Sequence, residues 1–324
     1  MVARGSRYGE KKGQFCGERR GFGGILELPD GAPTAVALFA HCFSCGKDVA
    51  AGVRIARYLA VRGIATLRFD FAGLGGSEGE FRNTTFSSNA ANLVSAARYL
   101  AQTLRAPDLL VGHSLGGAAV LPAASEIPSA RADVKMGAPF DPAHVTRLFA
   151  DATETIEREG MARVQVGLKT LEIGRAFLDD VRSVDTRYVG RLRRALLVFH
   201  APLDRTVDID QAEALFHAAK HPKSFVSLDK SDHLLSNKAD AEFVASTIAG
   251  WLPRQLERSD PVSRWESPAA PGEVVVDELN RAFARRVFTA THEWIADEPL
   301  HVGGRTLGLI PTRSCSPRSV PVLP

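Results

Sequence analysis

A serine flanked by glycines is the clearest chemical signature in this chain. The apolar run 109–111 leads into Gly112-His113-Ser114-Leu115-Gly116, and small residues follow. The pattern G-x-S-x-G after a strand is typical of a nucleophile elbow, in which glycines let the strand and helix backbones approach closely. Because so short a pattern also arises by chance in ordinary tight turns, Ser114 needs partners elsewhere in the chain. The partners expected for such a serine are an acid and then a histidine, in that order.

An acid and a histidine follow Ser114 in the required order. The apolar run 194–200 predicts a strand and ends in a turn that carries Asp204, and the alternating run 223–228 predicts the next strand before His233. We therefore predict a catalytic triad at the carboxyl edge of a parallel sheet, in which His233 accepts the Ser114 proton and Asp204 orients the imidazole. In the alternative, structural interpretation, His233 is a surface loop residue and Asp204 caps a helix.

Backbone N–H groups must stabilise the oxyanion that develops when such a serine attacks an acyl carbon. Leu115 is predicted to supply one, because it starts the helix after the nucleophile and the helix dipole adds positive potential there. Phe43, in the loop after the apolar run 35–40, is our choice for the second donor. Cys42 precedes it, at a position where many enzymes of this type have glycine.

The chain resembles the α/β-hydrolase family, in its serine aminopeptidase or esterase-like branch. More narrowly, it is similar to the hydrolase half of bifunctional α/β-hydrolase/OsmC-family proteins of bacteria. The resemblance covers about residues 20–252, and its matching stretches are 37–43, 67–79, 112–117 and 200–204. It implies a hydrolase fold and an enzyme that cleaves an ester, thioester or amide bond, either a carboxylic ester hydrolase or a serine aminopeptidase-like enzyme.

Strand and helix signals alternate through residues 20–252, as an α/β protein with a doubly wound, mostly parallel sheet requires. Residues 1–19 are interpreted as an N-terminal tail, and 24–28 as an early edge strand. The loop 70–79 is rich in glycine, but it lacks the G-K-[ST] of a phosphate-binding loop. Residues 85–104 predict the helix before the nucleophile strand.

The alternation breaks at about residues 142–185, where an insertion is predicted to form a helical lid. Its helix-like segments are 145–158 and 166–181. Two interpretations of its larger apolar residues stay open, contact with substrate or attachment of the insertion to the body; these residues are Phe149, Ile156, Met161, Leu171, Ile173 and Phe177.

The region after residue 252 has a different composition. Residues 253–271 are rich in proline, serine and charge and are interpreted as a linker. Runs 272–277 and 285–295 predict two strands of a separate sheet, and 272–304 resembles the opening of an OsmC-like domain. That family's function is thiol-dependent hydroperoxide reduction, but the helices with its reactive cysteines are missing and Cys315 matches neither. We therefore interpret this region as a truncated, β-rich stub.

Residues 305–324 show no helical period and no strand run, so we expect them to be disordered. A shifted reading frame forms each codon from the third base of one residue's codon and the first two bases of the next residue's codon. Over this tail, such codons permit the amino-acid string GPDPYEVLLAALGACTA. Because that string resembles the next segment of an OsmC-like domain, we predict that residues after about Gly304 are read in a shifted frame.

Composition limits the classes of function. The chain has 324 residues, 45% of them hydrophobic and 24% charged, which suits one large core with a smaller second unit. A net charge of +3 with scattered basic residues argues against nucleic-acid binding. The N-terminus lacks the apolar core of a signal peptide, and no run approaches the roughly 18 apolar residues of a membrane helix. We expect a cytoplasmic protein that acts on a small-molecule acyl substrate without cofactor, metal or membrane; homo-oligomerisation stays open.

Cys42 and Cys45 form a C-x-x-C pair, which elsewhere can bind metal or act in redox chemistry. No second C-x-x-C accompanies it, and a cytoplasmic setting keeps thiols reduced, so we expect two free thiols that pack locally. Three functions remain in competition: a serine hydrolase, a thiol-dependent redox protein of the OsmC type, and a catalytically silent α/β-hydrolase fold that serves as a binding module.

Overall fold

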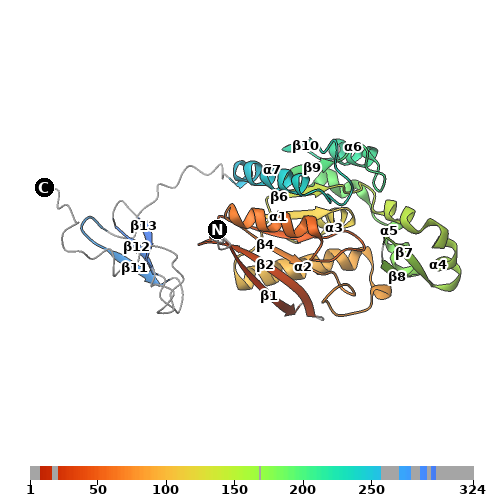
Figure 1. The fold of residues 1–324 in the computed structure, drawn as a ribbon, viewed down its shortest axis with the longest axis horizontal. Helices are drawn as coiled ribbons and strands as arrows, with labels where there is room; N and C mark the ends of the chain where they lie inside the picture. The colour runs from red at the N-terminus through yellow and green to blue at the C-terminus, as the bar shows by residue number, and fades with distance from the viewer. Residues whose placement is uncertain are drawn as a thin grey trace, which may run out of the picture. The chain divides into compact units, whose positions relative to one another are not determined.

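An eight-stranded sheet forms the centre of the protein (Figure 1). The structure is a computed structural model that describes residues 8–16, 21–167, 169–256, 270–278, 285–289 and 293–296. The strand order is β1-β2-β4-β3-β5-β6-β9-β10. β2 runs antiparallel to both of its neighbours, β1 and β4, and all the other neighbouring strands are parallel to each other. The strands are β1 (Tyr8–Cys16), β2 (Gly21–Pro29), β3 (Ala35–Ala40), β4 (Ile64–Phe69), β5 (Leu109–His113), β6 (Ala132–Met136), β9 (Ala195–His200) and β10 (Lys223–Ser227). The predicted doubly wound, mostly parallel α/β sheet is confirmed.

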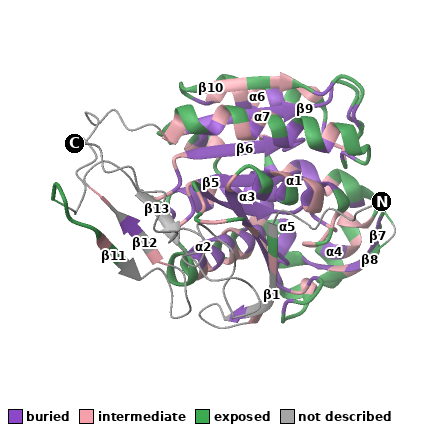
Figure 2. Ribbon diagram, turned by 60° about the vertical axis from the view of Figure 1, so that its left-hand side comes forward, coloured by how far each residue is buried: buried purple, intermediate pink, exposed green. Residues whose placement is uncertain are grey.

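Helices cover both faces of this sheet. On one face lie α1 (Ala50–Val61) and α7 (Lys238–Leu256), and on the other lie α2 (Phe86–Thr103), α3 (Leu115–Ala124) and α6 (Ile209–Ala218). Every residue of β3, β4, β5, β6 and β9 is buried, and Figure 2 shows β5 and β6 as continuously buried ribbons. Because strands buried on both faces are mostly apolar, β3, β5 and β9 appear in the sequence as apolar runs, whereas β4 and β6 also bury charged side chains.

The helix before the nucleophile strand has the predicted extent because its N-terminus is fixed by a capping box. The Thr85 hydroxyl accepts from the Ser88 backbone N–H, and the Ser88 hydroxyl accepts from the Thr85 N–H. Two otherwise unpaired backbone donors are thereby satisfied. The 3-10 turn η1 (Phe81–Asn83) precedes this cap.

The N-terminus differs from the sequence prediction. Residues 8–16, assigned to a tail, form strand β1, which pairs antiparallel with β2 along its whole length. The segment 24–28 is therefore not an edge strand, because β1 covers its outer side. Phe15 is buried and stacks on Tyr99 of α2 with ring centroids 4.5 Å apart. β1 was not recognised as a strand because six of its nine residues are glycine or polar and no alternating apolar pattern results.

The insertion between β6 and β9 is only partly helical. It contains η2 (Pro142–Ala152), α4 (Thr153–Glu159), β7 (Met161–Val166), β8 (Lys169–Gly174), α5 (Arg175–Arg182) and η3 (Thr186–Arg191). The prediction of a helix over 166–181 is wrong for its first half, since β7 and β8 form an antiparallel hairpin. Exposed and buried residues alternate along 163–166, which is the period of a strand rather than of a helix.

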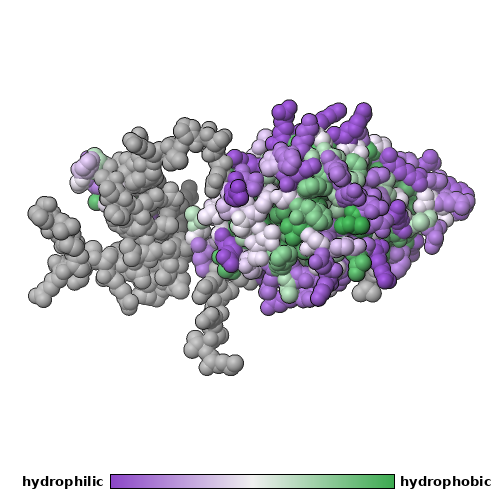
Figure 3. Space-filling view, turned by 90° about the horizontal axis from the view of Figure 1, so that it is seen from above, coloured by the Kyte–Doolittle hydropathy of each residue, from purple (hydrophilic) through white to green (hydrophobic). Residues whose placement is uncertain are grey.

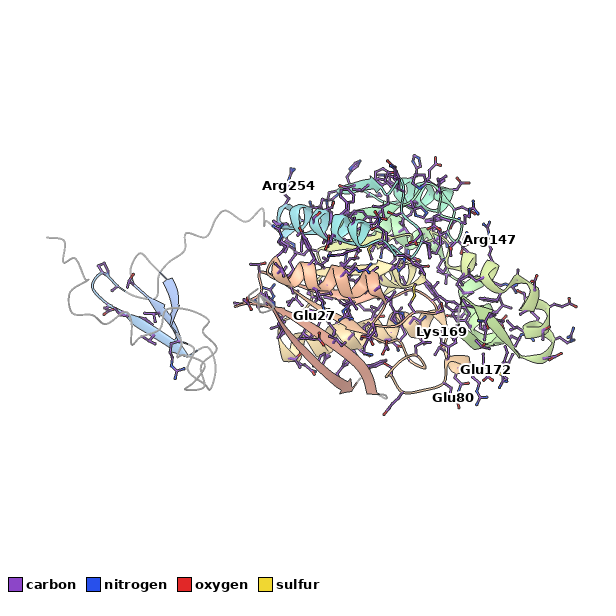
Figure 4. The ribbon with its side chains drawn as sticks, viewed as in Figure 1. Glu27, Glu80, Arg147, Lys169, Glu172 and Arg254 are labelled. Atoms are coloured by element: carbon purple, nitrogen blue, oxygen red, sulfur yellow. A yellow bond between two sulfur atoms is a disulfide. The ribbon has the colours of Figure 1, made fainter. Side chains whose placement is uncertain are left out.

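Most of the apolar lid residues attach the insertion to the body. Five of the six candidates are buried in the same cluster as the sheet and α2, whereas Met161 is 37% exposed. Polar contacts add to this attachment: Lys169 Nζ donates to the Cys45 carbonyl at 3.1 Å, and Arg82 lies 2.7 Å from Glu80 and 3.7 Å from Glu172. Figure 4 shows Lys169, Glu172 and Glu80 where the hairpin meets the body. The packing interpretation therefore accounts for these five residues.

One face of the first unit carries both polar and apolar side chains (Figure 3). Seen from the side of α7 and α6, hydrophilic side chains surround a smaller hydrophobic area (Figure 3). β10 and α7 each expose a phenylalanine, Phe225 and Phe243. Among the described residues, no helix combines the length and the apolar character needed to cross a membrane.

The chain divides into two compact units, residues 1–257 and 258–324. In the second unit, β11 (Val275–Glu278), β12 (Arg285–Phe288) and β13 (Glu293–Ala296) form an antiparallel three-stranded sheet. The run 285–295 is thus two strands, not one. Residues 253–256, assigned to the linker, belong to α7, because Leu252 is buried and the helix continues through Pro253. The rest of the linker up to residue 269, the predicted tail 305–324 and Cys315 lie outside the described residues.

Candidate active site

Ser114 lies on the turn between β5 and α3 with an unusual backbone conformation. Its φ of 54° and ψ of −127° fall in a region that non-glycine residues rarely adopt, at a typical cost of about 1–3 kcal/mol. The Ser114 N–H donates to the Met136 carbonyl of β6 at 2.9 Å, which ties the turn to the neighbouring strand. This strained strand-to-helix turn is the predicted elbow.

The glycines around Ser114 make close contacts that no side chain would allow. A Cβ on Gly112 would collide with the Gly117 Cα, and one on Gly117 would lie 2.6 Å from the Ala138 Cβ. These contacts bring strand and helix together as the motif predicts. Gly116 has a different neighbour, since its Cβ would collide with the His41 carbonyl oxygen after β3. The elbow and the loop after β3 are therefore in direct contact.

The structure brings Ser114, His233 and Asp204 together from three separate loops. His233 Nε2 lies 3.0 Å from Ser114 Oγ, and His233 Nδ1 lies 2.7 Å from Asp204 Oδ2. With a neutral imidazole, Nδ1–H donates to the carboxylate and Nε2 accepts from the serine hydroxyl. This geometry is the one that transfer of the Ser114 proton to His233 requires.

Asp204 is held as an ionised acceptor. Its Oδ1 accepts from the backbone N–H groups of Thr206 at 2.8 Å and Val207 at 3.1 Å. Burial by itself would raise the pKa of the Asp204 carboxyl, but the hydrogen bond from His233 and these two backbone donors outweigh it, and the pKa lies below its ordinary value. The carboxylate therefore stays charged beside the imidazole.

Gly137, after β6, was not singled out from the sequence. Its φ is +53°, and a Cβ there would lie 3.3 Å from His233 Nδ1 and 3.4 Å from Asp204 Oδ2. A side chain would crowd the hydrogen bond between these two residues. A glycine directly after a buried strand was the signal that could have identified this position.

Two buried histidines next to the site were also missed. His113 Nε2–H donates to the His233 carbonyl at 2.7 Å, and burial lowers the pKa of His113 to about 4. His41 Nδ1–H donates to the Cys42 carbonyl at 2.7 Å, while its Nε2 accepts from the Phe71 N–H at 3.2 Å. Burial likewise lowers the pKa of His41 to about 4. Both imidazoles are therefore neutral near pH 7 and act as fixed hydrogen-bonding braces.

The two proposed oxyanion donors lie on segments that touch. Leu115 is the first residue of α3, where N–H groups have no partner within the helix. The loop of Phe43 reaches α3 through the contact between His41 and Gly116. The Phe43 ring is buried with its centroid 5.3 Å from Phe177 and 5.5 Å from Phe81, so packing fixes the position of its backbone.

Cys42 and Cys45 are joined by a disulfide, so the expectation of two free thiols is wrong. The Cys45 N–H donates to the Cys42 carbonyl at 3.2 Å, and this turn brings the Cα atoms to 5.2 Å, within the usual range for a disulfide. Among the described residues, no group of three or more His, Cys, Asp and Glu side chains is arranged to hold a metal ion.

Comparison with known proteins identifies the class. A sequence profile of the Alpha/beta hydrolase family matches residues 37–301. The crystal structure of the esterase domain of a Rhodothermus marinus protein is 44% identical, with a TM-score of 0.64 over 76% of this chain and 98% of that one. The chain therefore belongs to the alpha/beta hydrolase family and is an enzyme of the hydrolase type.

More distant relatives agree in fold. Est1E from Butyrivibrio proteoclasticus, solved with ferulic acid, is 19% identical, with a TM-score of 0.61 over 76% of this chain and all of that one (100%). The uncharacterized protein YfhR of Salmonella typhimurium is 22% identical over 200 residues, which are 62% of this chain and 65% of that relative. The chain thus spans slightly less than two thirds of that relative's length. The OsmC-like character of residues 272–304 stays a prediction.

Proposed function

We propose that the protein is a serine hydrolase that cleaves carboxylic esters through an acyl-enzyme. The observation that carries this proposal is the hydrogen-bonded series from Ser114 Oγ through His233 to Asp204, with distances of 3.0 and 2.7 Å. The similarity to the Rhodothermus marinus esterase domain supports an ester over a thioester or an amide. The match at 44% identity covers 98% of that domain and 76% of this chain.

In the proposed mechanism His233 Nε2 accepts the Ser114 proton as Oγ attacks the acyl carbon. The Phe43 and Leu115 N–H groups stabilise the oxyanion, and the imidazolium that forms is stabilised by Asp204. The bond to the leaving group then breaks, and His233 returns the proton to the departing oxygen. Water, activated by the same histidine, releases the acid and restores Ser114.

A fluorophosphonate probe tests this proposal, because it reacts with activated serines. We expect stoichiometric labelling that maps to the peptide of Ser114, and none in Ser114→Ala. Hydrolysis of 4-nitrophenyl acetate should fall by on the order of 10³-fold or more in that variant. Ser125→Ala is the matched control, since Ser125 is exposed just after α3. Wild-type turnover in Ser114→Ala would refute the assignment.

A further inference from the structure

A small pocket opens directly at Ser114. Its volume is about 10 Å³, and its lining includes Ser114, His144, Val145, Leu148, Thr206 and Val207. A volume of this size holds roughly one water-sized group. Any part of a substrate that occupies it must therefore be very short.

The lid contains a much larger hollow, which shares one lining residue, Leu148, with the pocket at Ser114. Its volume is about 700 Å³, and residues of η2, α4 and the β7–β8 hairpin line it, Met161 among them. Of the described residues, Leu148 alone lines both this hollow and the pocket at Ser114. The Leu148 side chain, which is 36% exposed, thus borders both spaces.

A third space lies on the side of His233. This groove, of about 530 Å³, is formed by the loops after β3 and β4, the tip of the lid hairpin and Leu234, the residue that follows His233. Val49, Val166 and Leu234 give it an apolar character, with Lys169 at its rim. It has room for a ring system or a branched alcohol.

The direction of proton transfer decides which part of an ester goes to which space. His233 returns the proton to the leaving oxygen, so the leaving group must lie on the side of His233. The groove lined by Leu234 is the candidate space for the leaving group, because Leu234 directly follows His233 in the chain. The pocket at Ser114, which Leu115 and Leu148 line, is then left for the acyl group.

We propose that this site is specific for esters with a short acyl group and a bulkier leaving group, and that Leu148 sets the limit on acyl length. The inference rests on the proposed esterase function. An acyl chain of more than two or three carbons would meet Leu148 and the buried Val145, which both line the pocket at Ser114. A methylene that fits or fails to fit an apolar pocket typically changes specificity by about 10–200-fold.

The experiment measures kcat/KM for 4-nitrophenyl acetate, butyrate and octanoate with the full chain and three variants. In the wild type, octanoate should be hydrolysed at least about tenfold less efficiently than acetate. Leu148→Ala should raise the octanoate-to-acetate ratio at least about tenfold, because the pocket then opens into the lid hollow, and Leu148→Val should give an intermediate ratio. Met161→Ala is the matched control: Met161 is as exposed as Leu148 but lines only the lid hollow.

A second series varies the leaving group at constant acetate. Acetates of phenol and 2-naphthol, which are of similar acidity, should be cleaved with similar kcat/KM, since the groove accepts either. A wild-type preference for octanoate, or a folded Leu148→Ala with an unchanged ratio, would overturn the inference while leaving the esterase proposal intact. Failure of the esterase proposal would look different: no ester in either series would be cleaved in a manner dependent on Ser114.

Discussion

His113 Nε2 donates a hydrogen bond to the backbone carbonyl of His233 over 2.7 Å. The residue before the candidate nucleophile therefore fixes the loop that carries the candidate base, although 120 positions separate the two in sequence. The two rings also lie close, with centroids 5.2 Å apart. Through this contact the β5 strand end supports both Ser114 and His233.

His113→Phe should lower kcat/KM for 4-nitrophenyl acetate by about 10–100-fold, because the His233 carbonyl loses a buried donor and its loop can shift. His113→Gln keeps an N–H donor and should restore part of the rate. His217→Ala serves as the control, since His217 is exposed on α6. Equal rates for the Phe and Gln variants would contradict a positioning role for this hydrogen bond.

Gly137→Ala should reduce esterase activity at least about tenfold and lower the melting temperature. The φ of +53° is unfavourable for alanine by roughly 1–2 kcal/mol, and the new Cβ would press on the His233–Asp204 contact. Gly250 provides the contrast, because it lies within α7 and a Cβ there meets nothing within 4 Å. Gly250→Ala should keep full activity and gain about 0.5–1 kcal/mol of stability. Activity and melting curves of both variants check this pair, and a fully active Gly137→Ala would contradict it.

The protein should lose stability as the pH falls from about 7 towards 4. The pKa of both His41 and His113 is lowered from 6.5 to about 4 by burial, so between these values the unfolded chain binds protons that the folded chain does not. Stability therefore rises with pH across this window and is lost on acidification. Urea unfolding at several pH values measures the slope. His113→Gln should flatten it, whereas a slope unchanged by that substitution would exclude His113 as a contributor.

Replacing both Cys42 and Cys45 by serine should leave esterase activity within about tenfold of wild type, because the proposed oxyanion donor is the Phe43 main chain. The Cys42–Cys45 disulfide stabilises the loop, so the variant should melt at a lower temperature. The same variant tests the thiol-dependent alternative: hydroperoxide reduction that is present in the wild type and lost in the variant would favour the redox function.

Much of the fold was predictable because its strands are buried on both faces. Apolar runs identified β3, β5 and β9, and the elbow motif and the loops after β9 and β10 pointed to Ser114, Asp204 and His233. Each of these signals is a short run of residue types. Their order along the chain then indicated which loops meet at the carboxyl edge of a parallel sheet.

Where the sequence prediction failed, the deciding contacts came from distant segments. β1 has little apolar pattern and is a strand because β2 offers it a free edge to pair with. The lid hairpin β7–β8 was missed although residues 163–166 alternate between exposed and buried, because so short a run is ambiguous between strand and helix in the sequence. His41 and His113 resemble any other histidines in the sequence, and only tertiary burial makes them neutral braces of the site.

The sequence by itself thus determined the residue types of the candidate site and the order along the chain of the strands that carry them. Only the tertiary structure decided the distances of 2.7 and 3.0 Å around His233, the space beside them that the missing Cβ of Gly137 leaves, and the position of Leu148 in the lining of two cavities. The physical reason is that local patterns record which face of an element is buried. Distances and cavities depend on how side chains from several elements pack together, and no single segment encodes that packing.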